Sequence, residues 1–551
     1  MAKLRGERVI AQCFKNEGVD TVFFMMGGPT SGVAGGCLEL GMQGIYVRHE
    51  QAAAMMAHAY ARVTGKPGIC ITPSGPGTAN AVTGLANAWG DATPIIAIGG
   101  SAPMRGTTME TFQEMDQVSM MRPVVKAAYR VDVASRIPDY ISLAFREAMD
   151  GKKGPIYLDL PGDILATPVD TDKLHWPARH RDDLRSGGDP AMVERAIGIL
   201  QKAQRPIVVT GSGVLWSGAS ADLRNFIDAT GIPFWTTPQG RGVVPEDHPR
   251  SFPAARSTAF READVVLVIG ARANSMLTFL LPPRFAAEAK FINVNIDGKE
   301  IGHNREAEVG IVGDAKLVLQ QMTAAAAGKF KAREETPWIA HLASKQRTNA
   351  ERDAPLLNSD KVPIHPLRLC KEVRDIITRD TILVVDGHEI LNFARQSIPI
   401  YAPGTSINAG PHGCMGVGIP FGIGAKAAAP DKPVVVLSGD GAFGWNGMEM
   451  DSAIRHNLAI VVVISNNGGF TSHQTGWGAA GVKEGNVGRD LGWQRYDKMV
   501  EGFGGYGEFV EKPDQIRPAI ERALKSGKPA LVNVCTDPDA QATTNMGFAG
   551  Y

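Results

Sequence analysis

Short apolar runs alternate with longer, helix-like stretches along most of this chain. Each run has the length of a buried strand and is bounded by glycine, proline or polar residues. The stretches between the runs, such as Gln51 to Val63, have helical character. Repeated strand–helix units predict mostly parallel sheets with helices on both faces. In the first part of the chain, the runs cover residues 21–24, 44–47, 68–72, 94–98 and 155–160.

The alternation is interrupted twice. Residues 166–189 are polar and broken by prolines and glycines, which indicates a linker, and residues 326–362 predict a connecting helix and a second linker. At 551 residues, the chain is too long for a single hydrophobic core. We therefore predict three α/β domains, each a doubly wound parallel sheet, and a C-terminal tail that is either frayed or a short flap. The predicted bounds are 1–165, 190–325 and 363–537 for the domains and 538–551 for the tail.

The third domain holds the most informative stretch. An apolar run at residues 434–438 ends at Gly439-Asp440-Gly441, a sequence typical of a tight turn, and a second run at residues 458–465 ends at Asn466-Asn467. With a helical segment between the runs, the acid and the amide lie at the carboxyl ends of two parallel strands, where open α/β sheets bind ligands. Their oxygens suit Mg²⁺, and the glycines let backbone N–H groups approach a diphosphate. The stretch predicts a site for Mg²⁺ and a diphosphate-bearing cofactor.

Charge and cysteine usage narrow the class of protein. The chain carries 57 basic and 57 acidic side chains and has no basic block, which argues against a nucleic-acid partner. Its six cysteines are scattered without a CxxC pair, which argues against a zinc site or a disulfide framework and favours a reduced, cytoplasmic compartment. The charged N-terminus has no apolar signal core behind it, and no apolar window is long enough to predict a membrane span.

Two glycine-rich turns in the second domain are ambiguous. Gly211-Ser212-Gly213 follows an apolar run at residues 206–210, and Gly270-Ala271-Arg272 follows another at residues 265–269. Turns in these positions could bind a nucleotide, or they could only turn the chain between strand and helix. The residues alone favour neither interpretation.

Several motifs together resemble those of thiamine diphosphate (ThDP) enzymes of the acetolactate synthase-like superfamily. The C-terminal motif is Gly439-Asp440-Gly441-Ala442-Phe443 with Asn466-Asn467, separated by 24 residues between Gly441 and Asn466. The likeness covers nearly the whole chain and implies a pyrimidine-binding, a central and a diphosphate-binding domain, in that order. Further similar segments are Arg48-His49-Glu50, Gly75-Pro76-Gly77, Phe112-Gln113-Glu114 and Pro411-His412-Gly413-Cys414-Met415-Gly416.

Within this superfamily, the chain resembles 2-hydroxyacyl-CoA lyase, oxalyl-CoA decarboxylase and benzaldehyde lyase. Residues 270–274, 281–285 and 290–292 are similar to the central domain of 2-hydroxyacyl-CoA lyase. Two segments depart from these relatives. The CoA-dependent enzymes carry an Asn-Thr segment where this chain has Asp386–Ile390, and benzaldehyde lyase has a histidine in the turn that here reads Met26-Gly27-Gly28-Pro29.

The resemblance implies roles for individual residues. Glu50 would promote the imino form of the cofactor's aminopyrimidine, which removes the C2 proton of the thiazolium ring, and Gln113 would face C2. Asp440, Asn467 and the Gly469 carbonyl would bind Mg²⁺, and Met415 would support the bent cofactor. The implied cofactor-binding residues are Pro73, Gly387, His388, Gly413, Met415, Gly439, Asp440, Gly441, Ala442, Asn467, Gly469 and Phe470.

The resemblance also suggests a second ligand. In the CoA-dependent relatives the central domain carries an ADP-like pocket or helps to hold CoA, which here implies a bound ADP or CoA. The residues that would form this nucleotide site are Gly211, Arg272, Asp297 and Asp314. Four histidines are candidates for acid–base steps, and none is preferred over the others. They are His49, His388, His412 and His473.

The implied activity is a ThDP- and Mg²⁺-dependent carbon–carbon lyase, or carboligase in reverse, acting on 2-hydroxyacyl-CoA or 2-hydroxy ketones. A 2-oxo acid decarboxylase or acetolactate synthase-type carboligase is the first alternative, and a non-catalytic ThDP-binding paralogue is the second. Because the Glu and the Gly-Asp-Gly of one site come from different chains in this family, a homodimer or homotetramer is expected. Residues 469–485, which include Trp477, and the C-terminal tail would shape the substrate pocket.

Overall fold

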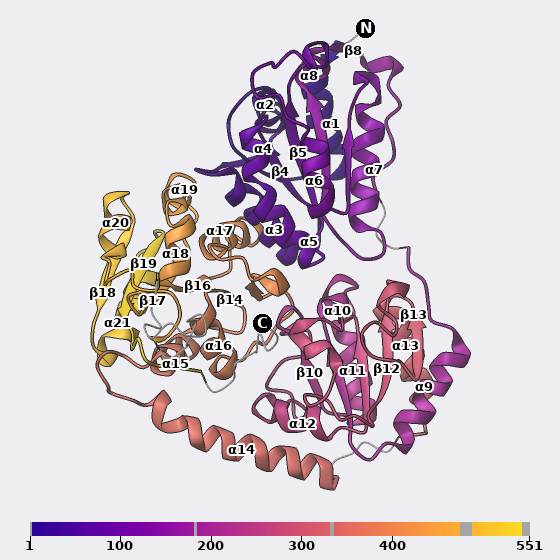
Figure 1. Ribbon diagram of the computed structural model, residues 1–551, viewed down its shortest axis with the longest axis vertical. Coiled ribbons are helices and arrows are strands. Elements are labelled where there is room, and N and C mark those ends of the chain that lie inside the picture. The colour runs from indigo at the N-terminus through magenta and orange to yellow at the C-terminus, as the bar shows by residue number, and fades with distance from the viewer. Residues whose placement is uncertain (1–2, 181–183, 331–334, 474–487, 543–551) are drawn as a thin grey trace.

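The computed structural model describes residues 3–180, 184–330, 335–473 and 488–542. Three parallel sheets, each with helices on both faces, follow one another along the chain (Figure 1). The predicted α/β class with three parallel-sheet domains is therefore confirmed. Of the segments expected to shape the substrate pocket, residues 474–487, with Trp477, and residues 543–551 lie outside the described residues.

The N-terminal sheet has six parallel strands in the order β3-β2-β4-β5-β7-β6. Its central strands are buried along their whole length, which explains their continuous apolar runs. The strands are β2 (Thr21–Phe24), β3 (Gln43–Tyr46), β4 (Gly68–Thr72), β5 (Ile95–Ser101), β6 (Ala127–Arg130) and β7 (Ile156–Pro161). One face packs on α1 (Gly6–Glu17), α2 (Ser31–Glu39) and α7 (Ile137–Met149), and the other on α3 (Glu50–Thr64) and α5 (Val82–Gly90). Shorter helices are α4 (Pro76–Asn80), α6 (Gln117–Met121) and α8 (Gly162–Ala166).

One strand of a small antiparallel pair lies within the segment that was predicted to be a linker. β1 (Lys3–Arg5) pairs with β8 (Pro168–Asp170), with Arg5 opposite Pro168. Proline cannot donate a ladder hydrogen bond, but it is tolerated where a strand has only one neighbour. The linker therefore begins with a strand that ties it back to the N-terminus.

The central sheet has five parallel strands in the order β10-β9-β11-β12-β13. The strands are β9 (Pro206–Thr210), β10 (Phe234–Thr236), β11 (Val265–Ile269), β12 (Lys290–Asn295) and β13 (Val309–Val312). One face packs on α9 (Pro190–Lys202), α10 (Ser212–Trp216), α11 (Ser220–Thr230) and α13 (Ala315–Ala326), and the other on α12 (Arg256–Glu262) and the long α14 (Pro337–Leu357). The predicted connecting helix within residues 326–362 is therefore confirmed as α14.

The C-terminal sheet again has six parallel strands, in the order β15-β14-β16-β17-β19-β18. The strands are β14 (Ile382–Asp386), β15 (Ser406–Asn408), β16 (Val434–Gly439), β17 (Val461–Asn466), β18 (Tyr506–Val510) and β19 (Ala530–Cys535). One face packs on α15 (Pro366–Ile376), α16 (His388–Ser397) and α21 (Pro513–Lys525). The other face packs on α17 (Gly418–Ala428), α18 (Asp440–Asn446), α19 (Glu449–Arg455) and α20 (Tyr496–Gly502).

The N-terminal and C-terminal domains share one hydrophobic core through α3 and α17, which lie between their sheets (Figure 1). The two helices approach so closely that a Cβ on Gly424 would lie 2.2 Å from the carbonyl oxygen of Met56. At the same boundary, the Glu449 carboxylate accepts hydrogen bonds from the backbone N–H groups of Arg48 and His49 at 2.9 and 3.0 Å. Residues just before Glu50 are thus held by the C-terminal domain.

Across the described ranges, no helix combines the length and the apolar character that a membrane crossing requires.

Candidate active site

The Gly439-Asp440-Gly441 stretch joins β16 directly to α18. Gly439 is extended, with φ −75° and ψ 153°, and Asp440 is the first residue of the helix. The prediction of a tight turn at this stretch is wrong, because neither glycine has the positive φ that such a turn would use. Gly441 instead provides space, since a Cβ there would lie 2.6 Å from the ring of Phe470. The motif therefore serves close packing at the start of a helix.

Asp440 is a buried carboxylate with one oxygen left open. Backbone groups of Asp440 itself, Gly441, Asn467 and Gly469 favour the charged form of its carboxylate, and the parallel neighbours β16 and β17 bring these residues together. Burial nevertheless raises the pKa of Asp440 to about 6. Its Oδ2 has no hydrogen-bond partner within the described part of the chain. A buried, unpaired carboxylate oxygen is costly unless a cation completes it, so the arrangement fits a bound metal ion.

Asn467 supplies a second oxygen beside Asp440. Its Nδ2 donates a hydrogen bond of 2.7 Å to the carbonyl of Thr471, which leaves the amide oxygen as the group that a cation could use. No group of three or more His, Cys, Asp or Glu side chains suited to a metal occurs among the residues that the structure describes. Metal binding at Asp440 would therefore depend on amide and carbonyl oxygens together with a ligand's own oxygens, a set that suits Mg²⁺.

A cleft at the carboxyl ends of the C-terminal strands gathers most of the predicted cofactor residues. Gly387, which follows β14 at this edge of the sheet, has φ +110°, a conformation that favours glycine. Gly413 (φ +62°) does not line the cleft but lies on the same loop as Met415, which does. Met415 is 39% exposed, so it is not a buried core residue. The predicted residues that line the cleft are Gly387, His388, Met415, Gly439, Asp440, Gly441, Ala442, Asn467, Gly469 and Phe470.

The two predicted catalytic residues, Glu50 and Gln113, and the predicted cofactor residue Pro73 lie in the N-terminal domain. Glu50 begins α3 and is buried, so it is not the solvated first-turn acid that its position alone would suggest. Its Oε2 accepts a hydrogen bond of 2.9 Å from Asn80. Gln113 has a positive φ of 61°, and its Oε1 accepts a hydrogen bond of 2.5 Å from Ser74. Pro73 lies beside these residues, because a Cβ on Gly77 would meet both the Pro73 ring and the Glu50 carboxylate.

The two groups of residues lie on different domains of one chain. Within the described ranges, no hydrogen bond or ion pair joins Glu50, Pro73 or Gln113 to the residues of the C-terminal cleft, and none of these three lines that cleft. Among the candidate histidines, only His388 lines the cleft. The other three contact protein groups: His49 caps α3, His412 packs beside Gly90, and His473 contacts Asp539 at 3.1 Å.

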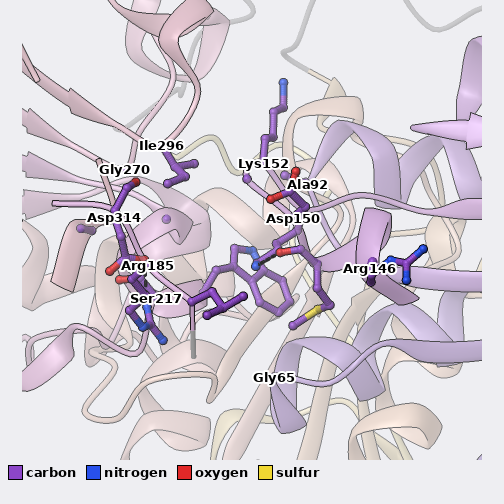
Figure 2. A pocket seen from close by; sticks show the side chains of 18 of the residues that line it. Gly65, Ala92, Arg146, Asp150, Lys152, Arg185, Ser217, Gly270, Ile296 and Asp314 are labelled. Carbon is purple, nitrogen blue, oxygen red and sulfur yellow. Dashed lines mark hydrogen bonds and ion pairs between the residues drawn. The ribbon is translucent and has the colours of Figure 1, made fainter. Parts of the chain in front are cut away.

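A second, larger cavity of about 1160 Å³ lies between the N-terminal and central domains. Figure 2 shows Arg146, Asp150 and Lys152 on one side, and Arg185, Asp314 and Gly270 on the other. Of the predicted nucleotide residues, Arg272 and Asp314 line the cavity, and Gly211 packs behind it against Gly270. Asp297 does not line it and instead caps a short helix by accepting from Lys299 N–H.

The sequence interpretation missed several residues of this cavity wall. They include Lys152, Lys153, Arg185 and Trp216, which come from three separate segments. The adjacent lysines in a glycine-bounded loop were the one local signal for an anion site. Basic side chains outnumber acidic ones along the wall, which therefore suits an anionic ligand.

Three doubly wound domains with a polar cleft at the strand ends form an α/β architecture whose cleft suits a metal ion and a diphosphate-bearing cofactor. The chain matches the thiamine pyrophosphate enzyme N-terminal TPP binding domain over residues 4–120, the central domain over residues 193–322 and the C-terminal TPP binding domain over residues 390–534. It belongs to the thiamine pyrophosphate enzyme family. The resemblance found in the sequence motifs is thereby confirmed.

Similarity to curated relatives indicates the type of reaction that the enzyme catalyses. The chain is 34% identical to a 2-hydroxyacyl-CoA lyase of Arabidopsis thaliana, over 98% of this chain and 96% of that protein. It is 35% identical to the acetolactate synthase large subunit IlvG of Mycobacterium tuberculosis, over 96% and 95% of the two chains. It is 34% identical to the oxalyl-CoA decarboxylase of Escherichia coli K12, over 97% and 95%. The protein is thus a ThDP-dependent enzyme of the carbon–carbon lyase and carboligase type.

Proposed function

We propose that the C-terminal cleft binds Mg²⁺ and the diphosphate of ThDP. The open Oδ2 of buried Asp440 is the observation that carries this proposal. Asp440 and Asn467 would bind the metal with their side chains and Gly469 with its carbonyl, while Gly439, Gly441 and the start of α18 would face the diphosphate. Gly387, His388, Met415, Ala442 and Phe470, which line the cleft, would form the rest of the cofactor site. Gly413 would contribute from the same loop as Met415, and Pro73 from the N-terminal domain.

Glu50 and Gln113 are the proposed catalytic residues. Bound ThDP supplies a nucleophilic carbon and an electron sink for breaking a carbon–carbon bond. Glu50 would hold a proton at the pyrimidine nitrogen, and its burial beside Asn80 keeps the carboxyl fixed and shielded from water. Gln113, held by Ser74, would orient a substrate oxygen.

We also propose the domain bounds 1–165, 190–325 and 363–537, with 538–551 as a tail.

The site would be completed by a second copy of the chain. Within one chain the Glu50 group and the Asp440 cleft lie on different domains without a described contact. Large apolar side chains near both groups are exposed, as expected where a partner covers them: Phe112 is 87% exposed and Trp445 59%. We therefore propose a homodimer or homotetramer in which Glu50 of one protomer acts with Asp440 of its partner.

Mixing two inactive variants tests the shared site. Glu50→Gln and Asp440→Asn each remove one half of it, and a heterodimer of the two contains one intact site and one doubly altered site. With random exchange of subunits, we expect recovery of about a quarter of wild-type activity. A mixture that exchanges subunits, as shown by differently tagged chains, and stays inactive would refute the shared site.

The substrate that we propose is a 2-hydroxyacyl-CoA or a 2-hydroxy ketone, cleaved to two carbonyl products. Full-length similarity to 2-hydroxyacyl-CoA lyases supports this choice. The holoenzyme should be screened with formyl-CoA plus aldehydes, benzoin and pyruvate, with products identified by mass. Turnover of pyruvate alone would favour the alternative, a 2-oxo acid decarboxylase or acetolactate synthase-type carboligase, which similarity to IlvG supports. No turnover of any of them, with ThDP bound, would contradict both proposed substrate classes.

We further propose that the larger cavity binds ADP, or the nucleotide part of CoA. The basic side chains along its wall, including Arg272 and Lys152, are the supporting observation. Calorimetric titration with ADP and CoA tests this, and we expect Arg272→Met to weaken binding more than the exposed Arg195→Met on α9. Equal binding by both variants would contradict it.

The scattered free cysteines support a cytoplasmic location.

A further inference from the structure

A buried polar junction lies where the three domains meet. It consists of His58, Arg62, Asp91 and Gln239, and the exposed fractions of these residues are 0, 2, 1 and 7%. His58 and Arg62 belong to α3, Asp91 follows α5, and Gln239 lies in a short helix of the central domain. Charged and amide groups in such a dry region need specific partners. The partners of this junction include the loop that carries Gly413 and Met415.

Gln239 and Asp91 support the start of that loop. Gln239 Nε2 donates a hydrogen bond of 3.2 Å to the carbonyl of Asn408, and Asn408 Oδ1 accepts from the Gly410 N–H at 3.1 Å. Gly410 has φ +66°, and a Cβ there would lie 2.4 Å from Gln239 Nε2 and 3.2 Å from Asp91 Oδ1. The loop backbone therefore rests directly on these two side chains.

Arg62 ties the same support to α3. Its Nη2 donates a hydrogen bond of 2.8 Å to the Gln239 carbonyl, and its Nη1 lies 3.9 Å from Asp91 Oδ2. The same Asp91 oxygen lies 3.0 Å from His58 Nε2. Because α3 begins at Glu50, one guanidinium links the helix of the catalytic acid to the turn that supports the cofactor loop.

The junction also touches the wall of the larger cavity. The Arg62 guanidinium lies over the Trp216 ring, with its Cζ 5.7 Å from the ring centroid. Arg272 donates a hydrogen bond to the carbonyl of Gly90, and a Cβ on Gly90 would lie 2.5 Å from the His412 ring. Trp216 and Arg272 both line the cavity. Continuous contacts therefore lead from the cavity wall to the cofactor loop.

The stability of the fold does not by itself explain why these polar residues are buried at the junction. Arg62 Nε and Nη1, Asp91 Oδ1 and Gln239 Oε1 have no hydrogen-bond partner within the described residues. Unpaired buried polar atoms are costly, and apolar residues in place of a buried ion pair are often as stable or more stable. The groups are therefore better explained by the geometry that they impose on the loop than by the stability that they add.

We propose that Arg62, Asp91 and Gln239 are positioning residues, which hold the Gly410–Met415 loop in place for ThDP and couple this loop to the wall of the larger cavity. The inference rests on the proposed ThDP site. A change at Trp216 then alters ThDP affinity, although Trp216 is not among the residues of the cofactor cleft.

ThDP dissociation constants provide the test, measured by calorimetry on the full-length apoprotein at saturating Mg²⁺, alongside its melting temperature. We expect Arg62→Met to raise the dissociation constant at least about tenfold and Trp216→Leu several-fold. Arg62→Lys, which keeps the charge facing Asp91, should give a smaller rise than Arg62→Met. Trp338→Leu is the matched control, because Trp338 is a buried central-domain tryptophan that donates to the Pro206 carbonyl, away from the junction. It should lower the melting temperature without changing ThDP affinity.

The outcomes separate this inference from the proposed function. If Arg62→Met and Trp216→Leu lower the melting temperature as Trp338→Leu does but keep the wild-type dissociation constant, the junction is only structural and the inference is wrong. If Arg62→Met does not fold, Gln239→Leu leaves the ion pair intact and must show the same rise, and an unchanged constant overturns the proposal. A wild-type protein that binds no ThDP overturns the proposed function itself.

Discussion

The N-terminal and C-terminal domains have the same sheet but carry different chemistry on it. Numbered within each domain, both sets of parallel strands lie in the order 2-1-3-4-6-5. The loop after the second strand leads to Glu50 in one domain and to Gly413 and Met415 in the other. The third strand is followed by Pro73 in the first and by Asp440 in the second. One scaffold thus presents a candidate proton-transfer group, and the other a candidate metal and phosphate site.

The helices that follow these corresponding loops, α3 and α17, pack against each other. Their contact, at Met56 and Gly424, fixes the two helices relative to each other within one chain. The difference between the domains therefore lies at the strand ends, where side chains do not have to fill the shared core. If this division of work is right, variants of the two domains should fail in different ways.

Removing the carboxylate of Glu50 should have the largest effect on turnover. We expect Glu50→Gln to lower kcat by about 10²–10⁴-fold, because a positioned acid–base group contributes this much, while ThDP affinity stays within about threefold of wild type. Steady-state kinetics and calorimetry measure the two quantities. Glu39→Gln, which alters an exposed acid of the same domain, is the control. Unchanged turnover by Glu50→Gln would remove the proposed role of the N-terminal domain.

Asp440 should destabilise the apoprotein at neutral pH. Burial raises its pKa from 3.8 to about 6, so the folded state holds the proton more tightly than the unfolded chain. The stabilisation that this proton provides is full below about pH 4 and is lost as the pH rises through 6, a change of about 3 kcal/mol. Asp440→Asn should therefore stabilise the C-terminal domain at pH 7.5 without Mg²⁺, and the gain should shrink towards pH 4.

Unfolding in EDTA at the two pH values measures this difference. Asp431→Asn, in an exposed loop before β16, should show no such pH-dependent gain. Addition of Mg²⁺ and ThDP should stabilise the wild type and not Asp440→Asn, because only the wild type keeps the open carboxylate oxygen. A variant that is less stable than wild type at pH 7.5 without ligands would show that the buried charge has a partner other than a cation.

Burial explains why several edge strands were harder to predict from the sequence than central strands. Central strands such as β4 and β11 are buried throughout, so they appear as continuous apolar runs. Among the strands that were not predicted, β6, β10 and β13 are at sheet edges, where they are short or partly exposed and show no such run. The buried interior strands β14 and β19 were also not predicted, although each is a continuous, largely apolar run. Edge strands carry a weaker sequence signal because only part of their surface is in the core.

The same reasoning explains which site residues could be predicted. Asp440 and Asn467 follow adjacent parallel strands, so their proximity follows from local pattern and sheet order. The cavity wall with Lys152 and Trp216 combines segments of two domains, and no local pattern reports how domains meet. Asp297 shows the opposite error, since an acid near a strand end was expected in the nucleotide site and instead caps a short helix.

Two glycines of α18 allow the edge of the cleft beside Asp440 to be probed more finely. A Cβ on Gly441 would lie 2.6 Å from the Phe470 ring, which lines the cleft, whereas a Cβ on Gly444 would meet nothing within 4 Å. Gly441→Ala should shift the ring and weaken ThDP binding by about 1–2 kcal/mol, measured by calorimetry. Gly444→Ala should leave binding unchanged and stabilise the helix by up to about 1 kcal/mol. Equal ThDP affinities for the two variants would contradict the role of close packing at Gly441.

The smallest effect should come from substitution of Asn80. It should differ from the effect of substituting Asn467, because the two amides make different contacts. Asn80 donates its N–H to Glu50, whereas Asn467 directs its N–H to Thr471 and leaves its oxygen for a cation. Asn80→Ala removes one hydrogen bond, worth about 1 kcal/mol, so kcat should fall about three- to tenfold with unchanged ThDP affinity. Asn467→Ala should instead weaken binding of Mg²⁺ and ThDP. If both variants lost affinity alike, the two domains would share the anchoring of the cofactor, and the division between them would be wrong.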